Sequence, residues 1–164
     1  MIITDPVEIE VVKSLPENCM GLYHCGENRI EILPPDATGA LRKPNSAFAE
    51  FPTEQFFDSI VTHELSHAAF DKIPCATGIC PATAEYVAYT MQIRSLIHAG
   101  HSDLGVGMNL DKTIENDEIN AVFLMMAPDI FIQKAWTHLS QQEDACSYVG
   151  QIMSGKIRFD FEAP

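Results

Sequence analysis

Apolar residues recur every three or four positions over several parts of the chain, which is the spacing of a helix with one buried face. The most regular of these parts covers residues 56–71. One stripe along it consists of Phe56, Ile60, His63 and His67. The pattern therefore predicts a helix that directs two histidines toward the protein interior. The same periodicity predicts helices at residues 82–99, 116–126, 128–139 and 143–153, with the apolar cluster 123–126 packed in the core.

The first third of the chain has a different pattern, with short apolar runs bounded by turn-forming residues. Strands are expected at residues 7–12, 21–25 and 30–33, with Gly26-Glu27-Asn28 as the turn of a hairpin. Residues 34–45 contain three prolines and a glycine and are expected to form an exposed loop. We expect an edge strand at residues 47–51 and a short strand at residues 156–161.

The length and composition set the fold class. At 164 residues, 46% of them hydrophobic, the chain can bury one sizeable core but is too short for two typical domains. We therefore expect a single domain over residues 1–164. Its class is α+β, with a small, mostly antiparallel N-terminal sheet followed by helices.

The predicted helix at residues 56–71 contains the motif His63-Glu64-Leu65-Ser66-His67. Residues four apart lie on one face of a helix, so both histidines can reach a single metal ion. The intervening Glu64 lies about 100° around the helix, where it can take a proton from a metal-bound water. This spacing is the H-E-x-x-H signature of zinc hydrolases.

A catalytic zinc generally takes three protein ligands, so a third must come from another element. The metzincin extension requires a glycine and a histidine where this chain has Phe70 and Ile73, which excludes that subclass. Glu85 lies in the first turn of the next predicted helix, and 17 residues separate it from the motif, enough for the chain to turn back. His98 and His101 are alternative ligands, and Glu85 can also be a favourable acid at a helix start.

The motif followed by Ala84-Glu85-Tyr86-Val87-Ala88-Tyr89 resembles the gluzincins, which include thermolysin-like and aminopeptidase-like enzymes. The resemblance covers residues 56–96. It implies a zincin-like fold in which His63, His67 and Glu85 bind Zn²⁺ and Glu64 is the general base. By the same analogy, the edge strand would bind an extended peptide through its backbone.

The resemblance leaves two roles open. Thermolysin-like enzymes carry an aspartate four residues after the ligand glutamate to orient a histidine, whereas this chain has Tyr89. Asp71, four residues after His67, is the candidate replacement. The group that stabilises an oxyanion is also undecided, with four candidates: Tyr86, Tyr89, His98 and His101.

The charge of the chain limits its partners. Ten Lys plus Arg against 23 Asp plus Glu give a net charge of −13, so nucleic acid and anionic membrane surfaces are repelled. No apolar stretch has the roughly 20 residues that span a bilayer, and the first residues lack the pattern of a signal peptide. The expected partner is a peptide or protein substrate, with no nucleic acid and no membrane span.

Five cysteines bear on the compartment. Cys19 and Cys25 form one local pair, Cys75 and Cys80 form another, and Cys146 has no close neighbour in sequence. The pairs predict two local disulfides, which favour a secreted or periplasmic protein, and the alternative is five reduced cysteines in the cytoplasm. The second disulfide would stiffen the crossover between the two ligand-bearing helices.

The sequence thus predicts a zinc metallopeptidase that hydrolyses peptide bonds with an activated water and Glu64 as base. Two alternatives remain. One is a zincin-like module that binds zinc and peptide without catalysis. The other is a cytosolic regulatory metallopeptidase, similar to those that cleave phage repressors.

Overall fold

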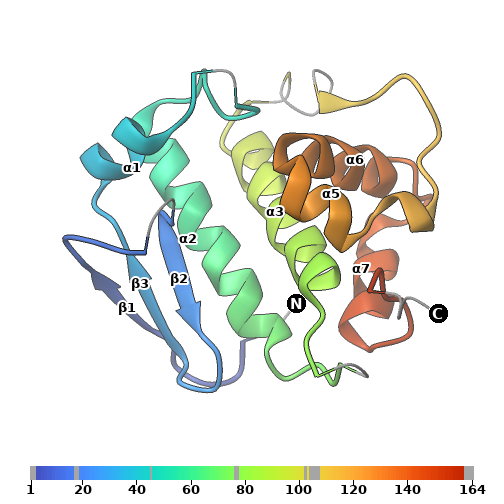
Figure 1. Cartoon of the computed structure of the whole chain (residues 1–164), viewed down its shortest axis with the longest axis horizontal. Helices are drawn as coiled ribbons and strands as arrows, with labels where there is room; N and C mark the ends of the chain where they lie inside the picture. The colour runs from blue at the N-terminus through green and yellow to red at the C-terminus, as the bar shows by residue number, and fades with distance from the viewer. Residues whose placement is uncertain are drawn as a thin grey trace.

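A computed structural model describes residues 3–16, 19–44, 46–75, 78–101, 103 and 108–160 of the chain (Figure 1). The fold is α+β, with a small sheet on one side of a long central helix and further helices on the other side. The elements in chain order are β1 (Glu8–Val11), β2 (Gly21–His24), β3 (Arg29–Ile32), α1 (Pro35–Leu41), α2 (Thr53–Phe70), α3 (Pro81–His98), η1 (Asn116–Glu118), α5 (Ala121–Met126), α6 (Pro128–Ser140) and α7 (Ala145–Met153).

The sheet has the order β1-β3-β2. The predicted hairpin is confirmed: β2 and β3 pair antiparallel, and Gly26 (φ 78°) and Asn28 (φ 49°) adopt the left-handed backbone that the tight turn requires. β1 pairs parallel with β3, so the sheet contains one antiparallel and one parallel pair and is not mostly antiparallel.

Two segments before α2 differ from the prediction. Residues 34–45 contain α1, because Pro35 occupies the first helical turn, where its missing N–H costs nothing, and Asp36 favours the helix start. Residues 47–51 form turns and not an edge strand. Phe48 and Phe51 are both buried, and their carbonyls accept hydrogen bonds from the Arg42 guanidinium, which holds the turn against the core.

The central helix α2 packs against β2 and β3 on one side and against α3 on the other. The remaining helices α5, α6 and α7 lie beyond α3 (Figure 1). This order places the motif helix in the middle of the molecule, so its buried stripe faces α3. Among the described residues, no helix is long and apolar enough to cross a membrane.

Two predictions for the C-terminal half are wrong. Met125 and Met126 at the end of α5 are 74% and 80% exposed, whereas Phe123 and Leu124 are packed against the core. Only one side of this six-residue helix faces the core, and that side carries Phe123 and Leu124. Residues 156–160 form no strand; they run alongside the start of α3, where Phe159 is fully buried.

Candidate metal centre

Three side chains converge between the two central helices. His63 and His67 extend from α2, and Glu85 extends from the first half of α3. The two histidine Nε2 atoms are 3.1 Å apart, and the Glu85 carboxylate oxygens lie 3.4 Å from Nε2 of His63 and 3.5 Å from Nε2 of His67. The structure therefore brings together the three side chains that the resemblance implied as ligands, and this group could hold a metal ion.

The ligand atoms fit a metal better than they fit each other. A tetrahedral zinc with bonds of about 2.0–2.2 Å separates its ligand atoms by about 3.3–3.6 Å, close to the three separations found here. Oε2 of Glu85 is buried and has no hydrogen-bond partner among the described residues, although it lies 3.4 Å from an imidazole nitrogen. A buried carboxylate oxygen without a donor is costly, and a cation bound between the three side chains would remove that cost.

A buried glutamine fixes the orientation of one histidine. Nδ1 of His63 lies 3.2 Å from the side-chain oxygen of Gln92, and the Gln92 amide nitrogen donates to Ser59 Oγ at 3.1 Å. The Ser59 hydroxyl in turn donates to the carbonyl of Phe56. Because Gln92 offers His63 an acceptor, it favours a proton on Nδ1, which is the tautomer that binds a metal through Nε2.

Gln92 was missed by the sequence prediction. It lies seven residues after Glu85, which is two helical turns and the same face of α3. That spacing was the available signal. Asp71, the predicted orienting residue, instead accepts hydrogen bonds from the Tyr23 hydroxyl at 3.1 Å and from the Gly26 backbone N–H at 3.0 Å. It therefore ties the hairpin turn to the end of α2.

Two contacts fix where α3 begins and therefore where Glu85 lies. The predicted Cys75–Cys80 disulfide is present, with a Cα–Cα distance of 5.9 Å, and closes the crossover from α2. Asp160, from the other end of the chain, accepts hydrogen bonds from the backbone N–H groups of Ala82 and Thr83 at 2.8 and 3.0 Å. Asp160 thus caps α3 in place of a residue from the crossover itself.

Glu64 lies beside the three ligands and under the edge of the sheet. It is only 6% exposed, and its Oε2 accepts a hydrogen bond from the Tyr23 backbone N–H at 3.0 Å. A Cβ atom on Gly21 would come within 2.6 Å of Glu64 Oε1, so β2 can pass this close only because residue 21 is glycine. The edge strand next to the motif is therefore β2, and not residues 47–51.

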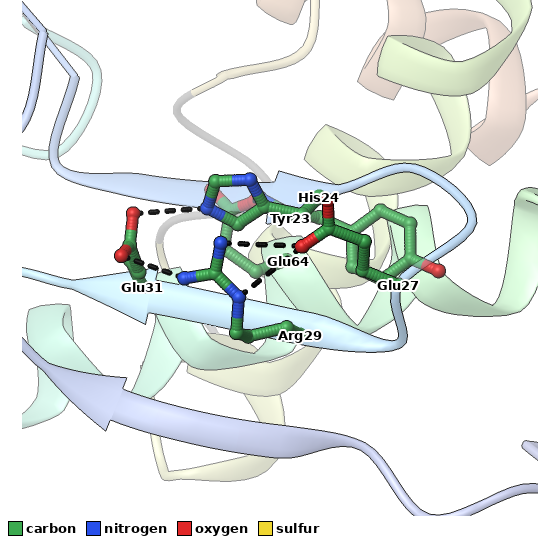
Figure 2. A network of polar contacts seen from close by, with 6 residues as sticks. All are labelled: Tyr23, His24, Glu27, Arg29, Glu31 and Glu64. Carbon is green, nitrogen blue, oxygen red and sulfur yellow. Dashed lines mark hydrogen bonds and ion pairs between the residues drawn. The ribbon is translucent and has the colours of Figure 1, made fainter.

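The position of β2 follows from its pairing. The Leu33 N–H donates to the Met20 carbonyl, so residues 20, 22 and 24 direct their backbone groups toward β3, while Gly21 and Tyr23 direct theirs away from it. On the outer face, His24 contacts Glu31 at 2.9 Å, and Arg29 contacts both Glu31 and Glu27 (Figure 2). This polar network links the two strands of the hairpin on the face away from α2.

The electrostatics of the buried groups suit metal binding. Burial and the neighbouring His63 lower the pKa of His67 to about 4, so this imidazole is neutral near pH 7. Burial opposes the charged form of Glu85, but the two imidazoles together lower the pKa of its carboxyl group. Burial raises the pKa of Glu64, which moves it toward the range of a general base.

The four candidates for stabilising an oxyanion lie in different surroundings. Tyr89 lines the cleft, with its ring edge-on to His63 at a centroid distance of 4.6 Å. Tyr86 is fully buried, and its hydroxyl is bound to Nδ1 of His138 at 2.9 Å. His98 is exposed at the end of α3, and His101 contacts Gln55. Neither histidine is grouped with the ligands.

The second predicted disulfide is wrong. Cys19 and Cys25 are free, as is Cys146. Cys19 and Cys25 lie on either side of β2. An extended chain rises about 3.4 Å per residue, so the four residues of this strand alone keep the two cysteines more than about 10 Å apart. A disulfide requires Cα atoms within about 7 Å.

His63, Glu64, His67 and Glu85 line a cleft of about 940 Å³. Its walls include the edge of β2, the Cys75–Cys80 crossover and the start of α6. Apolar side chains from separate elements contribute to the lining, among them Leu22, Leu41, Ile79 and Ile132. The site is therefore accessible from solvent although the ligands themselves are largely buried.

Comparison with known proteins gives one match. No curated protein and no solved structure matches the chain. The sequence model of one protein family matches residues 1–162, almost the whole length. The chain therefore belongs to DUF6639, a family of unknown function.

Proposed function

We propose that the protein is a zinc-dependent peptidase of zincin-like type. The observation that carries the proposal is the convergence of His63, His67 and Glu85 at separations of 3.1 to 3.5 Å with Glu64 beside them. Two imidazoles and a carboxylate are a common ligand set of hydrolytic zinc, which acts as a Lewis acid and lowers the pKa of a bound water.

The residues of the chain have distinct roles in this proposal. Glu64 takes a proton from the attacking water and passes it to the leaving amine. Its raised pKa, caused by burial, brings it closer to the value needed for both transfers. The Tyr23 N–H holds the carboxylate at the edge of β2, where an extended peptide can pair with the outward backbone groups of Gly21.

Tyr89 is the remaining candidate for stabilising the oxyanion. It lines the cleft next to His63, and no hydrogen bond of its hydroxyl is found among the described residues. Burial, together with the charges of Glu85 and Glu64, raises its pKa, so the phenol stays protonated and can donate a hydrogen bond. The Cys75–Cys80 disulfide is compatible with an extracellular or periplasmic location.

A non-catalytic zinc-binding module is the second candidate. The observation that favours it is the near-complete burial of Glu64 and its bond to the Tyr23 N–H, which limit its reach toward a water. Both functions require metal, so only turnover distinguishes them.

The test combines metal analysis with cleavage of a peptide library by protein purified without chelator. Under the peptidase proposal, wild type contains about one zinc per chain and cleaves peptides, while Glu64→Gln keeps the zinc and loses at least about 100-fold in activity. Glu54→Gln, an exposed acid in the first turn of the same helix, is the matched control and should keep both. Full activity in Glu64→Gln would contradict the mechanism. Stoichiometric zinc without cleavage would favour the second candidate.

A further inference from the structure

The outer strand of the sheet, β1, has an apolar face that nothing in the described structure covers. All four residues of β1 are exposed, and Ile9 and Val11 are 44% and 58% exposed. Their partners on β3, Ile30 and Ile32, are on the same face and are fully buried. The side chains of β3 are buried and those of β1 are exposed because α2 packs on β2 and β3, whereas β1 lies farther out at the edge of the molecule (Figure 1).

The backbone of β1 has a free edge as well. The N–H of Glu8 donates to the Asn28 carbonyl and the N–H of Val12 donates to the Ile32 carbonyl, both at 2.9 Å. Backbone groups alternate in direction along a strand, so Ile9 and Val11 direct their N–H and C=O groups away from the sheet. These groups are available to one further strand.

The polar face of β1 carries two acids. Glu8 and Glu10 are exposed, and neither forms an ion pair within the part of the chain that the structure describes. Arg29, the residue of β3 opposite Glu8, is already engaged with Glu27 and Glu31. The strand therefore presents two carboxylates that no described residue pairs with on one face and two apolar side chains on the other.

We propose that β1 is a docking strand for an extended segment of another polypeptide, in which Lys or Arg alternates with apolar residues. Such a segment would add to the sheet edge through the backbone of Ile9 and Val11. Its basic side chains would lie beside Glu8 and Glu10, and its apolar side chains beside Ile9 and Val11. β1 is the opposite edge of the sheet from β2, the strand that contacts Glu64, so the docking strand is separate from the candidate metal centre.

A second copy of the same chain fits this edge poorly. Two antiparallel copies of β1 would have to form hydrogen bonds between their outward residues, Ile9 and Val11. In the two registers that pair most of the strand, with Ile9 opposite Ile9 or Ile9 opposite Val11, Glu10 of one copy lies directly opposite Glu8 or Glu10 of the other. Like charges directly opposite are destabilising, and the net charge of −13 adds to the repulsion.

The probe for the test is a fluorescent, end-blocked peptide of six residues in which Lys and Val alternate, with an alternating Glu and Val peptide as its counterpart. Fluorescence anisotropy measures binding to the full chain. We expect the Lys peptide to bind at least about tenfold more tightly than the Glu peptide. The double variant Glu8→Lys with Glu10→Lys should reverse that preference, whereas Glu143→Lys, an exposed acid near α7, should not.

A backbone variant tests the edge itself. Ile9→Pro removes an outward N–H and leaves the β1–β3 hydrogen bonds in place. The variant should therefore unfold at the same temperature as wild type but bind the Lys peptide at least about tenfold more weakly. His63→Ala should bind the peptide as wild type does, whether or not the protein is a peptidase. Loss of binding in His63→Ala would mean that the peptide occupies the cleft. Unchanged binding in Ile9→Pro, or a dimer in wild type that Val11→Lys dissociates, would equally overturn the proposal.

Discussion

Replacing Gln92 with methionine tests whether the glutamine relay controls metal binding. Gln92 is 4% exposed and bridges Nδ1 of His63 and Oγ of Ser59. Methionine has a similar length and volume and can fill the same space, but it has no carbonyl acceptor and no amide donor. The change therefore removes two polar contacts while creating little cavity.

The expected loss of stability follows from the buried polar groups that the substitution leaves without partners. A buried donor without a partner costs about 1–3 kcal/mol, and the His63 N–H loses its acceptor within the core. The Ser59 hydroxyl keeps its bond to the Phe56 carbonyl, so its loss is smaller. We expect the metal-free protein to lose about 1–3 kcal/mol of stability. Because the imidazole can then rotate or carry its proton on Nε2, zinc affinity should fall about 10- to 100-fold.

Zinc affinity is measured by competition with a chromophoric chelator, and stability by urea unfolding of metal-free protein. Gln92→Glu is the informative companion, since it keeps an acceptor for His63 and should retain more affinity than Gln92→Met. Gln151→Met, at an exposed position on α7, controls for the substitution itself. Wild-type zinc affinity in a folded Gln92→Met variant would refute the role of the relay.

Four further outcomes are expected. Glu85→Ala should lose most zinc affinity in the same competition assay, and Glu85→Asp should weaken it because its shorter side chain withdraws the carboxylate; unchanged affinity in Glu85→Ala, with loss in His98→Ala, would indicate a three-histidine site instead. Tyr89→Phe should keep zinc and KM but reduce kcat about 100-fold in steady-state kinetics, and an unchanged kcat would exclude it as the oxyanion donor. Burial lowers the pKa of His138 to about 4, below the 6.5 of an unfolded chain, so the unfolded state binds the proton first and stability falls as the pH drops through this window. In urea unfolding of metal-free protein, His138→Gln should lose about 2 kcal/mol less than wild type between about pH 7 and about pH 5, and equal pH slopes in the two proteins would contradict this. Asp160→Ala should cost about 1–2 kcal/mol of stability by removing the cap of α3, and a thermal transition identical to that of wild type would show that the cap is dispensable.

Local sequence patterns were sufficient to predict two elements near the site. The helix carrying His63, Glu64 and His67 followed from apolar periodicity, and the hairpin followed from a glycine- and asparagine-containing turn between two short runs. Both patterns arise because side-chain direction repeats with the period of the element. The ligand status of Glu85 was one of several possibilities, since helix spacing alone cannot say which face of α3 meets α2.

Features that depend on contacts between distant segments could not be predicted from local patterns. The helix at Pro35–Leu41, with three prolines around it, was predicted as a loop, because proline at a helix start and proline in a loop look alike in sequence. The two exposed methionines of α5 were assigned to the core, because an apolar run does not reveal which side has a neighbour to pack against.

The candidate metal centre shows the same division. His63 and His67 share one helix and could be paired from spacing alone, whereas Gln92 and Asp160 act on the site across 29 and 77 residues of sequence. The Tyr23 N–H reaches Glu64 only because β2 is an edge strand of the sheet and because Gly21 has no side chain that would clash with Glu64. Hydrogen bonds of this kind depend on how helices and strands pack together, and packing is set by the sum of many distant contacts that no local pattern records.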